Sequence, residues 1–176
     1  MKNYSEKIRK TALLGILGAL ALVLSFTESL IMPQTTFLPL GAKPGLSNIV
    51  TMFVTDSMGF FGGLYIVLLK AVFALATRGA TAGLMSLSGG LLSLAVVALM
   101  LKINSRNVTM TGIGVLSSCA HNMGQLAVSC IITGTSALIN YAPFLLMFGI
   151  LTGIVTGLIL QIVLPKIRKA TEKTIV

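Results

Sequence analysis

Six apolar runs divide the chain, separated by short stretches that carry most of the charged and turn-forming residues. The runs cover about residues 11–32, 46–58, 59–77, 84–101, 109–133 and 143–164. A helix needs about 20 apolar residues to cross a bilayer, where its backbone must satisfy its own hydrogen bonds. The pattern therefore predicts an all-α polytopic membrane protein, a six-helix transmembrane bundle forming one domain over residues 1–176. The second run is the shortest, and we expect a helix break near Asp56 or Gly59 to bound it.

Composition supports membrane residence. Hydrophobic residues make up 55% of the chain and charged residues 10%, with no tryptophan, and the mean hydropathy is +0.97. A water-soluble globule of this length needs more polar surface than such a composition provides. The chain is therefore expected to lie in the lipid bilayer without a separate soluble domain.

The net charge of +9 is gathered at the membrane ends rather than on a nucleic-acid-binding face. Positive residues stay on the cytoplasmic side, so both termini are predicted to be cytoplasmic in a multi-pass protein of the cell membrane. Five further apolar runs also favour a retained first helix over a cleaved secretion signal. The basic residues placed inside are Lys2, Lys7, Arg9, Lys10, Lys102, Arg106, Lys166, Arg168, Lys169 and Lys173.

Small residues recur at helical spacing in the first and the last run. Gly149, Gly153 and Gly157 repeat every fourth residue, and Ala12, Gly15 and Ala19 line one side of the first helix. Such stripes let two backbones approach closely within a membrane. Internal packing of the bundle is one interpretation, and docking of a partner membrane protein, most plausibly on the first helix, is the other.

Polar side chains within or beside the apolar runs are the candidate binding residues, because such groups are costly in a membrane and mark functional sites. The six-crossing order brings most of them to the outer half of the bundle, with 33–45 as a natural lid. Interfacial or structural roles remain the alternative for each, and Lys70 could instead extend along its helix to the interface. The predicted substrate-binding residues are Glu28, Lys43, Asn48, Arg78, Ser88, His121, Asn122 and Gln125. Their excess of positive charge favours an anionic or phosphorylated ligand.

Several short motifs together resemble the Gx transporter family, whose members are often labelled heptaprenyl diphosphate synthase component I. They are Glu28 followed by Pro33, the segment Leu40-Gly41-Ala42-Lys43-Pro44-Gly45-Leu46-Ser47-Asn48-Ile49-Val50, Arg78, the run Ser86-Leu87-Ser88-Gly89-Gly90, and His121-Asn122-Met123-Gly124-Gln125.

The Gx transporter family is in turn similar to the S components of energy-coupling-factor vitamin transporters. That likeness implies six helices with inner termini, and a first-helix patch that meets a transmembrane coupling subunit connected to two ATPase subunits. By this resemblance, the docking patch would consist of Ala12, Gly15 and Ala19.

Prenyl diphosphate synthesis itself is not expected of this chain. That chemistry needs clustered aspartates to hold Mg²⁺, whereas the four acidic residues Glu6, Glu28, Asp56 and Glu172 include no adjacent pair. No phosphate-binding loop of the ATPase type is present. We therefore expect no enzyme activity, no metal and no cofactor.

A small-molecule transporter subunit is the favoured function, for a flavin-like or other anionic cofactor or precursor. The alternatives are a non-catalytic component of isoprenoid or quinone synthesis, and a scaffold of a membrane redox complex.

Overall fold

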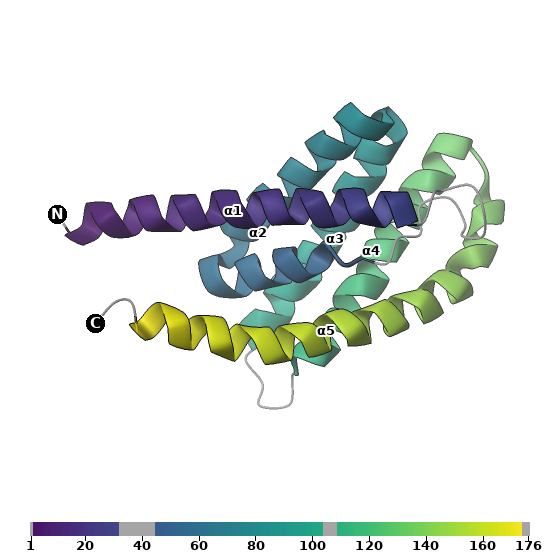
Figure 1. Ribbon diagram of the computed structural model, residues 1–176. Coiled ribbons are helices and arrows are strands. Elements are labelled where there is room, and N and C mark those ends of the chain that lie inside the picture. The colour runs from purple at the N-terminus through teal and green to yellow at the C-terminus, as the bar shows by residue number, and fades with distance from the viewer. Residues whose placement is uncertain (1, 32–44, 104–108, 174–176) are drawn as a thin grey trace.

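The computed structural model describes residues 2–31, 45–103 and 109–173, with side chains from 7 to 30, 45 to 103 and 109 to 165. Every element in these ranges is helical (Figure 1). They are α1 (Lys2–Ile31), α2 (Asn48–Arg78), α3 (Ala80–Ile103), α4 (Met110–Thr133), the 3-10 helix η1 (Ser136–Tyr141) and α5 (Ala142–Lys173).

Five helices are long and apolar enough to cross a membrane, which fits a multi-pass membrane protein. The predicted count of six is not confirmed, because runs 46–58 and 59–77 form the single element α2. The part of α2 before Gly59 rises only about 16 Å, about half the thickness of a hydrocarbon layer. Five candidate crossings rather than six are found because the run 46–58 forms only a half-length helix within α2.

Gly59 breaks α2 at the predicted boundary. Its φ of 79° and ψ of −175° are non-helical, and this region is readily open only to glycine. The two halves of α2 run in different directions from this point (Figure 1). They also contact each other closely, since a Cβ atom on Gly62 would lie 2.9 Å from the Cγ1 atom of Val54.

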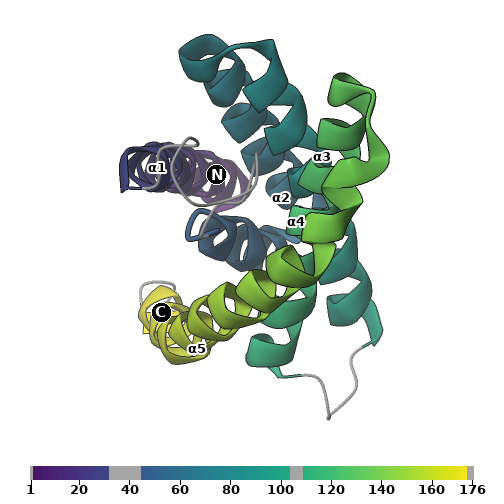
Figure 2. The ribbon, with the colours of Figure 1, turned by 90° about the vertical axis from the view of Figure 1, so that its right-hand side faces the viewer.

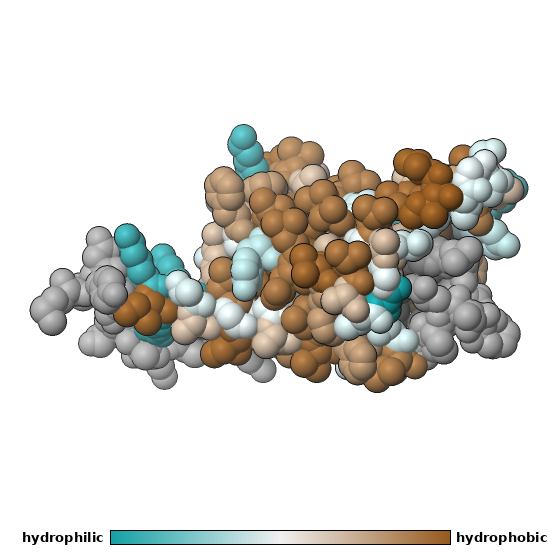
Figure 3. All heavy atoms as spheres, turned by 90° about the horizontal axis from the view of Figure 1, so that it is seen from above, coloured by the Kyte–Doolittle hydropathy of each residue, from teal (hydrophilic) through white to brown (hydrophobic). Residues whose placement is uncertain are grey.

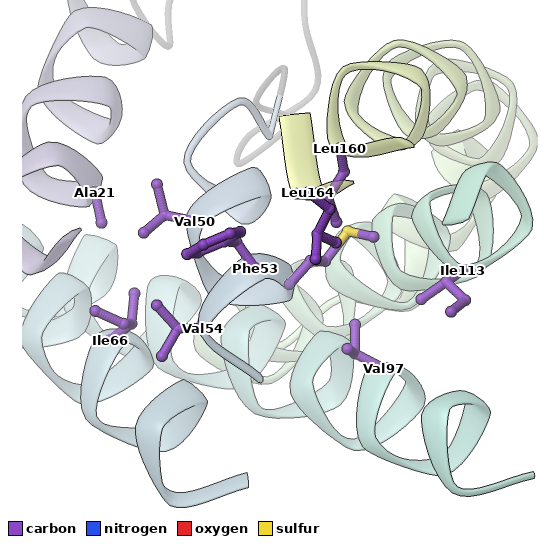
Figure 4. Close-up of a cluster of buried hydrophobic side chains, with 10 residues drawn as sticks. Ala21, Val50, Phe53, Val54, Ile66, Val97, Ile113, Leu160 and Leu164 are labelled. Carbon is purple, nitrogen blue, oxygen red and sulfur yellow. The ribbon is translucent and has the colours of Figure 1, made fainter. Parts of the chain in front are cut away.

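The half-helix 48–58 lies at the centre of the hydrophobic core. All residues from 50 to 55 are buried, and Val50, Phe53 and Val54 belong to a hydrophobic cluster that includes side chains from α1, α3, α4 and α5 (Figure 4). Partners in this cluster are Ala21 of α1, Ile66 of the second half of α2, Val97 of α3, Ile113 of α4, and Leu160 and Leu164 of α5. Apolar residues on several sides of this half-helix suit its enclosed position, although Asn48, Thr51 and Thr55 are buried with them.

The glycine stripe of α5 packs inside the bundle against α4. A Cβ atom on Gly157 would lie 2.5 Å from the Cα atom of Thr111, and one on Gly153 would collide with the backbone at Val115. Only glycine permits helix axes to come this close. For Gly149, Gly153 and Gly157 the structure therefore agrees with internal packing.

α1 lies at the edge of the molecule, with α2 between it and the pair α3 and α4 (Figure 2). It contacts α2 through Gly18, where an added Cβ would lie 2.8 Å from the Cδ2 atom of Leu69. Ala12, Gly15 and Ala19 are exposed instead, and no atom lies within 4 Å of a Cβ built on Gly15. The described surface around α1 is mostly apolar (Figure 3), as a lipid-facing surface requires.

Candidate functional site

Five of the predicted binding residues are buried polar side chains: Glu28, Asn48, His121, Asn122 and Gln125. Glu28 lies near the end of α1 and Asn48 at the start of α2, at the end of the molecule opposite the two termini (Figure 1). His121 and Gln125 lie farther along the chain, in the second half of α4. Their exposed fractions are 2% for Glu28, 1% for Asn48, 5% for His121 and 3% for Gln125.

Glu28 connects α1 to the start of α2. Its Oε1 atom accepts the backbone N–H of Ser47 at 2.8 Å, and its Oε2 atom accepts the Ser47 hydroxyl at 3.4 Å. Ser47 precedes α2 but makes no side-chain cap of its own. A carboxylate from another helix therefore satisfies a free N–H group at this helix start, where negative charge is also favoured by the helix dipole.

Lys70 is the cation nearest this arrangement. Its Nζ atom donates to the Oδ1 atom of Asn48 at 3.1 Å, and the side chain is only 4% exposed. Glu28 interacts electrostatically with Lys70 and with Arg78, the last residue of α2. From the sequence, Lys70 could either join the binding site or extend along its helix to the membrane interface. Its burial depends on the sharp turn at Gly59, which folds one half of α2 against the other.

His121 and Gln125 form a second part of the site, one turn apart on α4. Their Nε2 atoms lie 3.0 Å apart. Because an amide nitrogen only donates, the ring Nε2 accepts and the imidazole proton belongs on Nδ1. A Cβ on Gly89 of α3 would lie 2.9 Å from that Nδ1 atom. Lys70, in the first part of the site, also interacts electrostatically with His121.

Two predicted residues serve helix packing in this structure. The Ser88 hydroxyl donates to the carbonyl of Gly124 at 3.0 Å and lies 3.1 Å from the carbonyl of Met85. Asn122 donates from Nδ2 to the carbonyl of Leu145 on α5 at 2.9 Å. Asn122 thus turns toward α5, while its neighbour His121 lies against α3. Lys43 and all of the predicted lid except Gly45 lie outside the described residues.

Several of the predicted site residues carry buried polar atoms that lack a hydrogen-bond partner among the described residues. Asn48 Nδ2, Arg78 Nη1, His121 Nδ1 and Gln125 Oε1 are buried without a well-aligned hydrogen bond to any described residue, although the backbone of Gly89 lies near the His121 ring. Such atoms are rare in folded proteins, because each loses the hydrogen bonds it would make with water. Four of them on predicted site residues indicate a place where a bound molecule can complete the hydrogen bonding.

The same condition reveals residues that sequence analysis missed. Thr51 Oγ1, Ser93 Oγ and Ser118 Oγ are also buried without a partner among the described residues. Thr51 lies one turn after Asn48, and Ser118 lies one turn before His121. Helical spacing from these two predicted residues is the signal that could have found them. In the described ranges, no three His, Cys, Asp or Glu side chains come together as a metal site would need.

These features define a multi-pass membrane protein with a buried polar cluster between its helices. Residues 17–163 match the family described as heptaprenyl diphosphate synthase component I, and the chain belongs to that family. The match confirms the predicted membership in the family labelled heptaprenyl diphosphate synthase component I. Neither the curated proteins nor the solved structures provide a match to the chain.

Proposed function

We propose that this protein is the membrane substrate-binding subunit of a small-molecule transporter. It resides in the cell membrane with both termini in the cytoplasm. The ligand is captured between the helices by Glu28, Asn48, Arg78, His121 and Gln125, to which we add Lys70. Lys43, Ser88 and Asn122 remain proposed members of the binding set. Transfer across the membrane is driven by ATPase subunits through a transmembrane coupling subunit.

The observation that carries this proposal is the group of unpartnered polar atoms around Glu28 and His121. A purely structural polar cluster stabilises a bundle when its members satisfy one another. Here Asn48, Arg78, His121 and Gln125 each keep a buried atom with no hydrogen-bond partner in the part of the chain that the structure describes. In an apolar surrounding this arrangement costs free energy, and a polar ligand would recover it. The mixture of donors and an acceptor suits a ligand with several polar groups.

The exposed face of α1 supports a separate coupling subunit. Ala12, Gly15 and Ala19 lie on the outer side of α1. Among the described helices, α1 has substantial contacts with α2 alone. Small residues on an exposed membrane helix allow a second helix to approach closely. The chain has no ATP-binding loop of its own, so this face is the proposed place where energy from ATP hydrolysis reaches the binding subunit.

Ligand retention tests the proposal directly. The protein is purified in mild detergent, and bound small molecules are identified by native mass spectrometry. We expect one ligand per chain in the wild type and none in Gln125→Leu. Thr133→Ala, at the exposed end of the same helix, is the matched control and should retain the ligand. Wild-type protein that is reproducibly empty after gentle purification would contradict the proposal.

A second candidate is favoured by the family description. The chain could serve as a non-catalytic membrane component of isoprenoid or quinone synthesis, with the catalysis in another chain. Four scattered acidic residues do not provide the aspartate cluster that holds Mg²⁺ against a diphosphate. Reconstituted prenyl chain elongation with a separate catalytic subunit distinguishes the two: an absolute requirement for this protein favours the second candidate.

A further inference from the structure

We infer that the polar cluster recognises its ligand through one anionic oxygen group, a carboxylate or a phosphate, and that Arg78 is the residue that binds it. Lys70 and Glu28 instead compensate each other within the protein. This inference rests on the proposed function and adds the chemistry of the ligand and the residue that selects for it.

The carboxylate of Glu28 is already engaged. Both of its oxygen atoms face Ser47, at 2.8 Å from the backbone nitrogen and 3.4 Å from the hydroxyl. Lys70 interacts electrostatically with this carboxylate and donates to Asn48 at 3.1 Å. One negative and one positive charge thus offset each other where α1 meets the two halves of α2, each with a hydrogen-bond partner of its own.

Arg78 remains as the additional cation. Among the described residues of the cluster, Glu28 contributes one negative charge and Lys70 and Arg78 two positive charges, and a neutral His121 adds none. Arg78 is half-buried, and its Nη1 atom is buried without a partner. An uncompensated charge is costly in apolar surroundings. An anion bound at Arg78 would remove that excess.

The donors fit an oxygen anion. The planar guanidinium presents paired N–H groups that match a carboxylate or phosphate, and charge-assisted bonds of this kind are about twice as strong as neutral ones. The Nδ2 group of Asn48 provides a second unused donor. Asn48 directly follows Ser47, the residue that holds Glu28, so both donors belong to the surroundings of that carboxylate.

Thermal unfolding in neutral detergent, followed by far-UV circular dichroism, provides the test. The full chain, freed of copurified ligand, is titrated with inorganic phosphate at constant ionic strength, with chloride as the reference. We expect a saturable rise in Tm for the wild type and for Lys102→Gln, which removes an exposed cation at the end of α3. In Arg78→Gln the apparent phosphate affinity should fall at least about tenfold.

Arg78→Gln also separates ligand binding from a structural role. Without phosphate, its Tm should equal or exceed that of the wild type, because Glu28 and Lys70 then balance and the Nη1 atom of Arg78 makes no hydrogen bond to another described residue that could be lost. A structural arginine would instead lower Tm. Should this variant fail to fold, Arg78→Lys keeps the charge without the fork, and its phosphate affinity should fall below that of the wild type; an unchanged affinity would overturn the inference.

The outcomes distinguish the inference from the proposed function. A ligand found by native mass spectrometry together with no phosphate response in the wild type, or an equal response in Arg78→Gln, overturns the inference alone. An Arg78-dependent phosphate response in a protein that retains no small ligand supports anion recognition and contradicts the transporter. A response to phosphatidylglycerol micelles but not to phosphate would assign Arg78 to lipid headgroups and overturn the inference.

Discussion

The small-residue stripes of α5 and α1 have the same sequence pattern but opposite surroundings. On α5, Gly153 and Gly157 lie against the backbone of α4, with no room for a Cβ atom. On α1, Gly15 has no neighbouring atom within 4 Å of such a Cβ. The small-residue stripe of α5 therefore makes close backbone contact with α4, whereas the stripe of α1 contacts no described helix at Gly15.

This difference shows how the two helices are held. α5 is fixed along its length by backbone contact with α4, whereas α1 relies on its opposite face, where Gly18 meets α2 and Glu28 meets Ser47. Ala21 in the core and the Phe26–Phe73 ring contact hold the same side of α1. A helix held through one face can present its other face to a second protein. Substitutions on both helices therefore test whether exposed and enclosed glycines differ as the structure indicates.

The largest effect is expected for Gly153→Leu on α5. Its side chain would enter space occupied by the backbone of Val115 and Gly114, and a backbone cannot move aside as a flexible side chain does. The α4–α5 contact would open, with a loss of more than about 4 kcal/mol. We expect almost no monodisperse protein by size-exclusion chromatography in mild detergent. A wild-type yield of folded protein would show that this contact is not tight.

Glu28→Gln should have the next largest effect, because it removes the charge in the anchor of α1. The amide can still accept the N–H of Ser47, but Lys70 and Arg78 lose the negative charge with which they interact. Removing one member of a buried charged pair costs about 3 kcal/mol. Thermal unfolding by circular dichroism measures the loss. Thr27→Ala, at the exposed neighbouring position, should leave Tm unchanged, and equal Tm values for both variants would contradict the anchor.

Much of the fold could be predicted from the hydrophobic runs, but the number of membrane crossings could not. The sequence did not decide whether runs 46–58 and 59–77 cross separately. The break between 58 and 59 was correctly placed, since glycine follows a run that is too short to cross a membrane. Whether the two runs form separate crossings or one bent element depends on tertiary packing. The half-helix 48–58 is stabilised by burial against all other helices, and no local signal in the sequence contains that information.

Individual site residues could be predicted from the sequence, but the direction in which each side chain points could not. Adjacent residues on a helix point about 100° apart, so His121 and Asn122 cannot both face one ligand unless the partner helices permit it. In the structure, Asn122 bonds to α5 and His121 lies beside Gly89 of α3. Lys70 was undecided for a similar reason: only the turn at Gly59 brings it against Asn48.

An intermediate effect is expected for Gly18→Leu on the inner face of α1. The Cβ atom of the new side chain would lie 2.8 Å from the Cδ2 atom of Leu69 and 3.6 Å from the ring of Tyr65. These are ends of side chains that can rotate, so overpacking should cost about 2 kcal/mol. Tm should fall clearly below that of Gly15→Leu. The reverse order would mean that α1 presents its other face to α2.

The smallest effect on stability, and the most informative one, is expected for Gly15→Leu. Because the position is open and leucine has the higher helix propensity, the isolated protein should be as stable as the wild type or up to about 1 kcal/mol more stable. If this face docks the coupling subunit, the added side chain should block close helix approach and abolish substrate uptake in cells. Ligand retention by the purified protein should stay normal. Normal uptake by Gly15→Leu would contradict docking at this face, whereas lost ligand retention would place the defect in the binding site instead.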